Sequence, residues 1–120
     1  VLKADEDRAT IYRNIGNMQF EPMKHSAFDI FKYDYKEQGL PSAGTFVDID
    51  SDGDQDLAIA VGWGRSRIFQ NQFMETGHAD FIDVSDAMGL TEHTVSLAIS
   101  FLDYDGDANL DMLVSNALAP

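Results

Sequence analysis

The chain has 120 residues, 44% of them hydrophobic, which suits one folded domain or part of a larger one and argues against general disorder. A formal net charge of −13 argues against nucleic acid and anionic membrane surfaces as partners. There is no cysteine, which excludes disulfides and thiolate-bound metals, and no apolar run approaches the roughly 20 residues of a transmembrane helix.

The first expected elements are two short strands, at residues 10–14 and 18–23, within a segment 8–24. The stretch that follows is longer than its counterpart later in the chain, and it interleaves aromatic with charged residues. These rings either form a recognition loop or fold over a face of the sheet, and we favour the second interpretation. The aromatic residues are Phe28, Phe31, Tyr33 and Tyr35.

Residues 48–56, with the sequence DIDSDGDQD, place aspartates at positions 1, 3, 5 and 9 of a loop between expected strands at 45–47 and 57–61. Carboxylates this close repel one another unless a cation lies between them. Calcium takes six to eight oxygen ligands, including backbone carbonyls. The predicted ligands are the side chains of Asp48, Asp50, Asp52 and Asp56 and the carbonyl of Asp54 at position 7.

Residues 103–111, DYDGDANLD, repeat this spacing between strands expected at about 96–102 and 110–116. An EF-hand is excluded because it needs glutamate at position 12 and flanking helices, whereas position 12 is Ile59 or Val114 within a strand-like run. The alternative, an acidic turn that binds nothing, does not explain the repeated spacing. The predicted ligands of this second calcium site are Asp103, Asp105, Asp107 and Asp111 and the carbonyl of Asn109.

The two loops differ at position 6, where Gly53 in the first is replaced by Ala108 in the second. A sharp turn at this position favours a positive φ, which costs a non-glycine residue roughly 1–2 kcal/mol. The sequence therefore predicts that the second loop binds calcium more weakly and that Ala108→Gly tightens it.

Other candidate residues favour a structural interpretation. Trp63, framed by two glycines, either stacks on a sugar ring or packs at a hairpin tip, and packing explains it as well. His25, His78 and His93 lack the close spacing of zinc ligands and are interpreted as surface residues. There is no G-x-S-x-G nucleophile turn, and carboxylates committed to calcium are poor general bases, so we predict that the chain is not an enzyme.

The similarity between the two units extends beyond the loops. IYRN at 11–14 matches IFQN at 68–71, and the Gly-Leu pair at 39–40 matches the pair at 89–90. One unit contains four short antiparallel strands in about 55–60 residues, which is the content of a propeller blade. These motifs, with FIDV at 81–84 and AMGL at 87–90, resemble FG-GAP/VCBS repeats, in particular the cartilage-acidic-protein type found in secreted bacterial proteins.

The resemblance implies an all-β fold of four-stranded propeller blades, an extracellular location, and calcium in the hairpin between the first two strands of a blade. Its ligands would be the aspartates of the two loops. The expected organisation is half a blade at 8–24, a complete blade at 44–84 and half a blade at 95–118. Since no signal peptide precedes Val1, either a leader was removed or these residues come from within a longer polypeptide.

The expected function is a calcium-stabilised extracellular module for binding or adhesion. Its expected partners are other propeller blades or further copies of itself, and extracellular protein or glycan. The alternative is a structural subunit of an extracellular filament or ring, in which the half blades of neighbouring copies complete one another.

Overall fold

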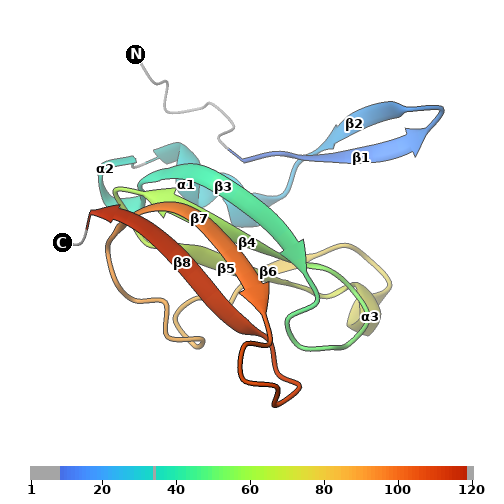
Figure 1. The fold of residues 1–120 in the computed structure, drawn as a ribbon. Coiled ribbons are helices and arrows are strands. Elements are labelled where there is room, and N and C mark those ends of the chain that lie inside the picture. Colours follow the sequence, from blue (N-terminus) through green and yellow to red (C-terminus); the bar gives the residue numbers. More distant parts are fainter. Residues whose placement is uncertain (1–8, 34, 119–120) are drawn as a thin grey trace.

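The computed structural model describes residues 9–33 and 35–118, which form three antiparallel sheets with short helical segments (Figure 1). Two-stranded sheets at the start and end of the described chain flank one four-stranded sheet of order β3-β4-β5-β6. The expected all-β class, with antiparallel sheets of the propeller-blade type, is confirmed. The strands are β1 (Ile11–Gly16), β2 (Gln19–Met23), β3 (Leu40–Val47), β4 (Asp56–Gly62), β5 (Arg67–Asn71), β6 (Phe81–Asp83), β7 (Val95–Leu102) and β8 (Asp111–Leu118).

The three sheets correspond in order to the expected half, complete and half units. The four-stranded sheet begins at Leu40, four residues before the expected start of the complete unit at 44, because β3 continues past a bulge between Pro41 and Ala43. Pro41 is tolerated there because β3 is the edge strand of this sheet. That the three intervals are successive blades of one propeller remains a prediction.

The strand β4 is buried from Asp56 to Val61 because both faces of its sheet are covered. Leu57, Ile59 and Val61 pack with the aromatic cluster on one face. Ala58 and Ala60 pack on the other face against Ile99 of β7, and their small side chains allow the two sheets to approach closely. This two-sided burial explains why the sequence of β4 is a continuous apolar run rather than an alternating one.

The aromatic stretch before β3 forms short helical segments that cover one face of the four-stranded sheet. Phe28 and Phe31 are 4% and 0% exposed, and their ring centroids lie 5.1 and 6.3 Å from that of Phe69. The interpretation that these rings fold over the sheet is therefore right for Phe28 and Phe31. The side chains of Tyr33 and Tyr35 are not among those that the structure describes. The segments are η1 (Ser26–Asp29), α1 (Ile30–Tyr33) and α2 (Tyr35–Gln38); a further helix, α3 (Phe73–Thr76), follows β5.

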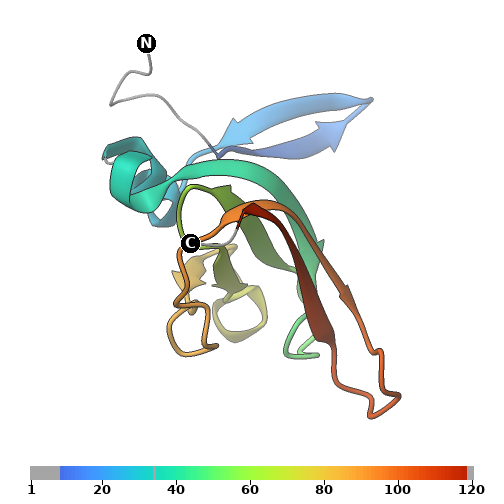
Figure 2. The same cartoon turned by 60° about the vertical axis from the view of Figure 1, so that its left-hand side comes forward.

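The β7–β8 sheet packs against the opposite face, as the rotated view shows (Figure 2). Its contact with the four-stranded sheet includes a polar seam around the fully buried Ser96. The carbonyl of Ser96 accepts a hydrogen bond from the hydroxyl of Ser42 at 2.7 Å, and its hydroxyl accepts one from Ser66 at 3.1 Å. These bonds fix the second aspartate loop relative to the first, because each loop connects strands of one of these two sheets.

The structure refines two expectations about single residues. Trp63 is 68% exposed, so its side chain is not buried against a neighbouring segment as a packed hairpin tip would be. The close contact is made instead by the backbone of Gly64, which forms an isolated bridge with Thr94. Of the three histidines interpreted as surface residues, His78 and His93 are exposed and His25 is half-buried. Its Nε2 lies 2.6 Å from Asp80 Oδ1, and its ring packs edge-on against Phe81.

Candidate metal centre

The two aspartate loops connect β3 to β4 and β7 to β8, and both lie at the same end of the molecule (Figures 1 and 2). Each replaces the turn of a β-hairpin. Strands follow both loops, so Ile59 and Val114, at position 12, lie in β4 and β8, and the exclusion of an EF-hand is confirmed. Because both loops leave strands at the same end of packed sheets, nine of the 21 acidic residues of this chain lie at that end.

The aspartate at position 1 organises each loop by accepting backbone hydrogen bonds. Asp48 accepts from the N–H groups of Asp52 and Gly53, both at 3.1 Å. Asp103 accepts from the matching N–H groups of Asp107 and Ala108, at 3.1 and 2.8 Å. In both loops the aspartate at position 1 therefore holds the same two backbone N–H groups, at positions 5 and 6. The repeated sequence spacing corresponds to a repeated backbone structure.

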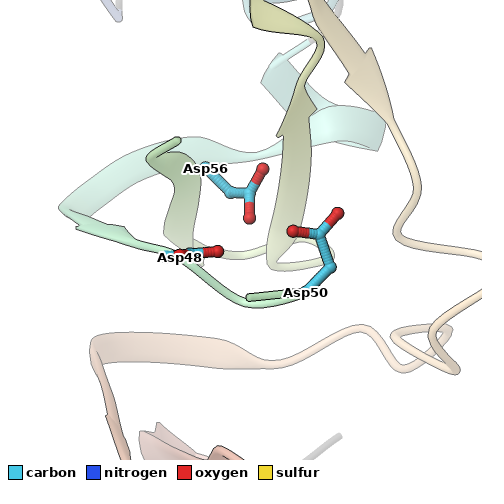
Figure 3. A group of neighbouring side chains, drawn as sticks. All are labelled: Asp48, Asp50 and Asp56. Atoms are coloured by element: carbon cyan, nitrogen blue, oxygen red, sulfur yellow. The ribbon is translucent and has the colours of Figure 1, made fainter. Parts of the chain in front are cut away.

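The carboxylates at positions 1, 3 and 9 converge in both loops. In the first, one oxygen each of Asp48, Asp50 and Asp56 lie within 4.8 Å of one another, and the side chains point toward a common space (Figure 3). In the second loop the same holds for Asp103, Asp105 and Asp111. Two unit charges about 4 Å apart repel by about 1 kcal/mol in water and about 4 kcal/mol near a protein surface. A cation bound by oxygen ligands would remove this repulsion, so both groups fit calcium.

Position 9 anchors the first loop to the rest of its sheet. Asp56 is fully buried and accepts hydrogen bonds from the N–H groups of Ile49 at 2.9 Å and of Asn71, at the end of β5, at 2.8 Å. The pKa of Asp56 is raised, mainly because the carboxyl group is buried. The two N–H donors lower this pKa, whereas the nearby Asp50 and Asp54 carboxylates raise it. In the second loop Asp111 accepts from the N–H of Tyr104 at 3.0 Å.

The two loops differ in the electrostatic environment of their carboxylates. The N–H of Ala108 is the main cause of a lowered pKa of Asp103, with the N–H groups of Gly106 and Asp107 adding to it. The N–H of Asn109 is the main cause of a lowered pKa of Asp107. The second loop thus favours ionised carboxylates through backbone donors, whereas the first holds a buried carboxylate whose ionised form is disfavoured.

The aspartates at position 5 lie outside the converging groups of three. Asp52 is grouped with Asp54 and Glu75 instead, and the carboxylate of Asp107 accepts hydrogen bonds from Asn109. The predicted role of Asp52 and Asp107 as calcium ligands, and of the carbonyls of Asp54 and Asn109, remains a prediction. Glu75 was not among the residues singled out from sequence, because it lies on α3, outside the repeated loop motif.

The backbone at position 6 has a positive φ in both loops, as the sequence predicts: 105° at Gly53 and 73° at Ala108. Position 4 does as well, with φ of 62° at Ser51 and 77° at Gly106. Each loop therefore has one glycine and one strained non-glycine residue, in opposite order. The prediction of a weaker second site compared only position 6, where Ala108 is strained and Gly53 is not. Because Ser51 carries the corresponding strain in the first loop, backbone strain does not distinguish the two sites.

We expect Ser51→Gly and Ala108→Gly to stabilise the chain by similar amounts. Each substitution removes the strain of a non-glycine residue with positive φ, which is about 1 kcal/mol. Part of this gain is offset because glycine increases the backbone entropy of the unfolded chain. The measurement is the free energy of unfolding in the absence of calcium. The matched controls Gly53→Ala and Gly106→Ala should destabilise by a comparable amount, and a gain confined to Ala108→Gly would contradict the equivalence of the two loops.

Comparison with known proteins agrees with this geometry. The FG-GAP-like repeat family matches residues 48–114, which begin at the first loop and end in β8 beyond the second. No curated protein and no solved structure matched the chain. The matched region covers more than half of the 120 residues and contains both complete loops, the strands β4 to β7 and both converging groups of carboxylates. The chain belongs to the FG-GAP-like repeat family.

Proposed function

We propose that this chain is a calcium-stabilised part of an extracellular β-propeller, which binds other molecules or mediates adhesion and does not catalyse a reaction. Its ligands would be Asp48, Asp50, Asp52 and Asp56 and the carbonyl of Asp54 in the first loop. In the second loop they would be Asp103, Asp105, Asp107 and Asp111 and the carbonyl of Asn109.

The observation that carries this proposal is the convergence of the carboxylates at positions 1, 3 and 9 in both loops. Their shared backbone scaffold gives the oxygen-rich, flexible surroundings that calcium prefers to the smaller and more strictly octahedral Mg²⁺. Calcium would neutralise the loops and lower the formal charge from −13 to −9 if each held one ion. Its binding free energy would then add to folding free energy.

An extracellular location and a non-enzymatic role fit the family, whose repeats are typically extracellular and non-catalytic. Weak, open calcium loops are filled at the calcium concentrations found outside cells. Among the described residues no helix is both long enough and apolar enough to cross a membrane. The proposal is tested by calcium removal and by substitution of one ligand per loop, with thermal unfolding as the readout.

A second candidate function is a subunit of an extracellular filament or ring. It is favoured by the two two-stranded sheets, whose outer strands have no further strand beside them among the described residues. Both sheets also expose large apolar side chains, which a neighbouring blade would cover. These are Tyr12, Ile15 and Phe20 in the first sheet and Leu97, Leu113 and Leu118 in the second. The covering blade would come from the same polypeptide or from another copy.

We expect the first loop to lose calcium at a higher pH than the second as the solution is acidified. Calcium binds ionised carboxylates, so protons compete with it for each ligand. Because the pKa of Asp56 is raised, Asp56 takes up a proton at a higher pH than an ordinary aspartate. Because the pKa of Asp103 is lowered, Asp103 takes up a proton only at a lower pH. The measurement is a series of calcium titrations between about pH 7 and pH 4, followed by the NMR signals of the Gly53 and Ala108 amides. Earlier release from the second loop would contradict the assignment.

A further inference from the structure

The first loop has a second group of acidic side chains beside the converging aspartates. Asp52 and Asp54 of the loop and Glu75 of α3 each offer a carboxylate oxygen, and these three oxygens lie within 4.8 Å of one another. This group shares no member with Asp48, Asp50 and Asp56. By itself a group of acidic residues does not indicate a site, so the question is whether its oxygens already have partners.

Two oxygens of this group are buried and have no hydrogen-bond partner among the described residues: Asp54 Oδ1 and Asp52 Oδ2. Asp54 is only 7% exposed, and its other oxygen accepts a hydrogen bond from the N–H of Met74 at 2.9 Å. A buried carboxylate oxygen without a donor loses its hydration and gains nothing in exchange. A positively charged ligand at these oxygens would compensate that loss.

The second loop provides an internal comparison. At position 7 it has Asn109, whose amide Nδ2 donates a hydrogen bond to Asp107 Oδ2 at 3.1 Å. Asp107 corresponds to Asp52, so the second loop supplies a donor to the same aspartate whose oxygen has no partner in the first. In the first loop Asp54 replaces that amide and brings a second carboxylate toward Asp52. A cation can take the place of the missing donor.

The helix α3 is held against this part of the loop by specific contacts. The N–H of Met74 donates to Asp54 of the loop, as described above. The N–H of Phe73 donates to Asn71 Oδ1 at 3.2 Å, and Nδ2 of Asn71 in turn donates to the carbonyl of Gln55 in the loop at 3.1 Å. A Cβ atom added at Gly53 would lie 3.9 Å from Cε of Met74. Glu75 therefore reaches the group because the connection after β5 is fastened to the loop.

We propose that Asp52, Asp54 and Glu75 form a further binding site for a divalent cation of the calcium type, next to the loop site. The three ligands are hard carboxylates without nitrogen or sulfur, which favours calcium over transition metals. The inference rests on the proposed function, because Asp52 is also a predicted ligand of the loop site. Occupation of this site would join α3 to the loop and restrict the motion of both.

The test is a count of bound calcium by equilibrium dialysis of the wild-type chain and two variants. Glu75→Gln changes an exposed residue and is expected to preserve the fold. Asp54→Asn reproduces the arrangement of Asn109, in which an amide can donate to the neighbouring aspartate. We expect each variant to bind one calcium ion fewer than the wild type, and the control Glu92→Gln, at an exposed glutamate before β7, to bind the full number.

A second readout is the Met74 amide, which donates to Asp54 of this site. Addition of calcium should shift the NMR signal of the Met74 amide in the wild type, whereas Asp54→Asn should abolish that shift and retain the calcium-dependent shift of Ala108. Asp54→Asn should also raise the melting temperature in the absence of calcium, because it removes a buried like-charge contact.

The outcomes separate this inference from the proposed function. If the wild type and both variants bind the same number of calcium ions, this inference is wrong while the loop sites stand. If Ala108 responds to calcium and Met74 does not, the same conclusion holds. A wild-type chain that binds no calcium at all contradicts the proposed function, and this inference with it.

Discussion

Removal of calcium is expected to lower the melting temperature of this chain more than any substitution at its surface. A site that binds only the folded state contributes about 2.7 kcal/mol when free calcium is about 100 times the dissociation constant. Metal-free loops also retain the mutual repulsion of the carboxylates at positions 1, 3 and 9. The measurement is thermal unfolding in millimolar calcium and again in excess EDTA.

Substitution of a position 1 aspartate separates the contributions of the two loops. Asp48→Ala and Asp103→Ala each remove a predicted ligand, but they also remove acceptors of backbone hydrogen bonds. The informative quantity is therefore the difference between the calcium and EDTA curves of each variant. We expect either variant to lose roughly half of the wild-type difference, and the exposed control Glu92→Gln to retain all of it. Calcium and EDTA curves that coincide for the wild type, without calorimetric uptake of calcium, would exclude the metal sites.

Phe69→Ala should be among the most destabilising single substitutions, at about 3–5 kcal/mol. Phe69 lies in β5, is fully buried, and packs against Phe28 and Phe31 of the segment that covers the sheet. Loss of the ring leaves a cavity between two layers that the backbone cannot close easily. The measurement is denaturant unfolding in saturating calcium.

The matched control for this substitution is Phe20→Ala, because Phe20 is 60% exposed in the β1–β2 hairpin and its loss should change stability little. Phe69→Ala should also weaken the first calcium site. The strand β5 carries Asn71, whose N–H holds Asp56 at position 9 of the loop. Equal stability losses for the two phenylalanine variants would show that the helical cover does not contribute to the core as described.

The local features of this protein followed from its sequence because they depend on short-range chemistry. The spacing of Asp48 and Asp50 relative to Asp56 was sufficient to predict a hairpin loop with converging carboxylates, since each of these side chains accepts a hydrogen bond from a backbone N–H within the same nine residues. The positive φ at Ala108 followed in the same way from its alignment with Gly53. Strand type was predictable from short apolar runs between these loops.

What the sequence could not provide depends on contacts between distant segments. The helical form of residues 26–33 and 35–38 goes with the packing of Phe28 and Phe31 on β5, and no local sequence pattern predicted it. The strain at Ser51 was overlooked because serine is an ordinary loop residue until the backbone geometry is known. The grouping of Glu75 with Asp52 and Asp54 arises only when α3 folds back onto a loop about 20 residues earlier, where the N–H of Met74 donates a hydrogen bond to Asp54.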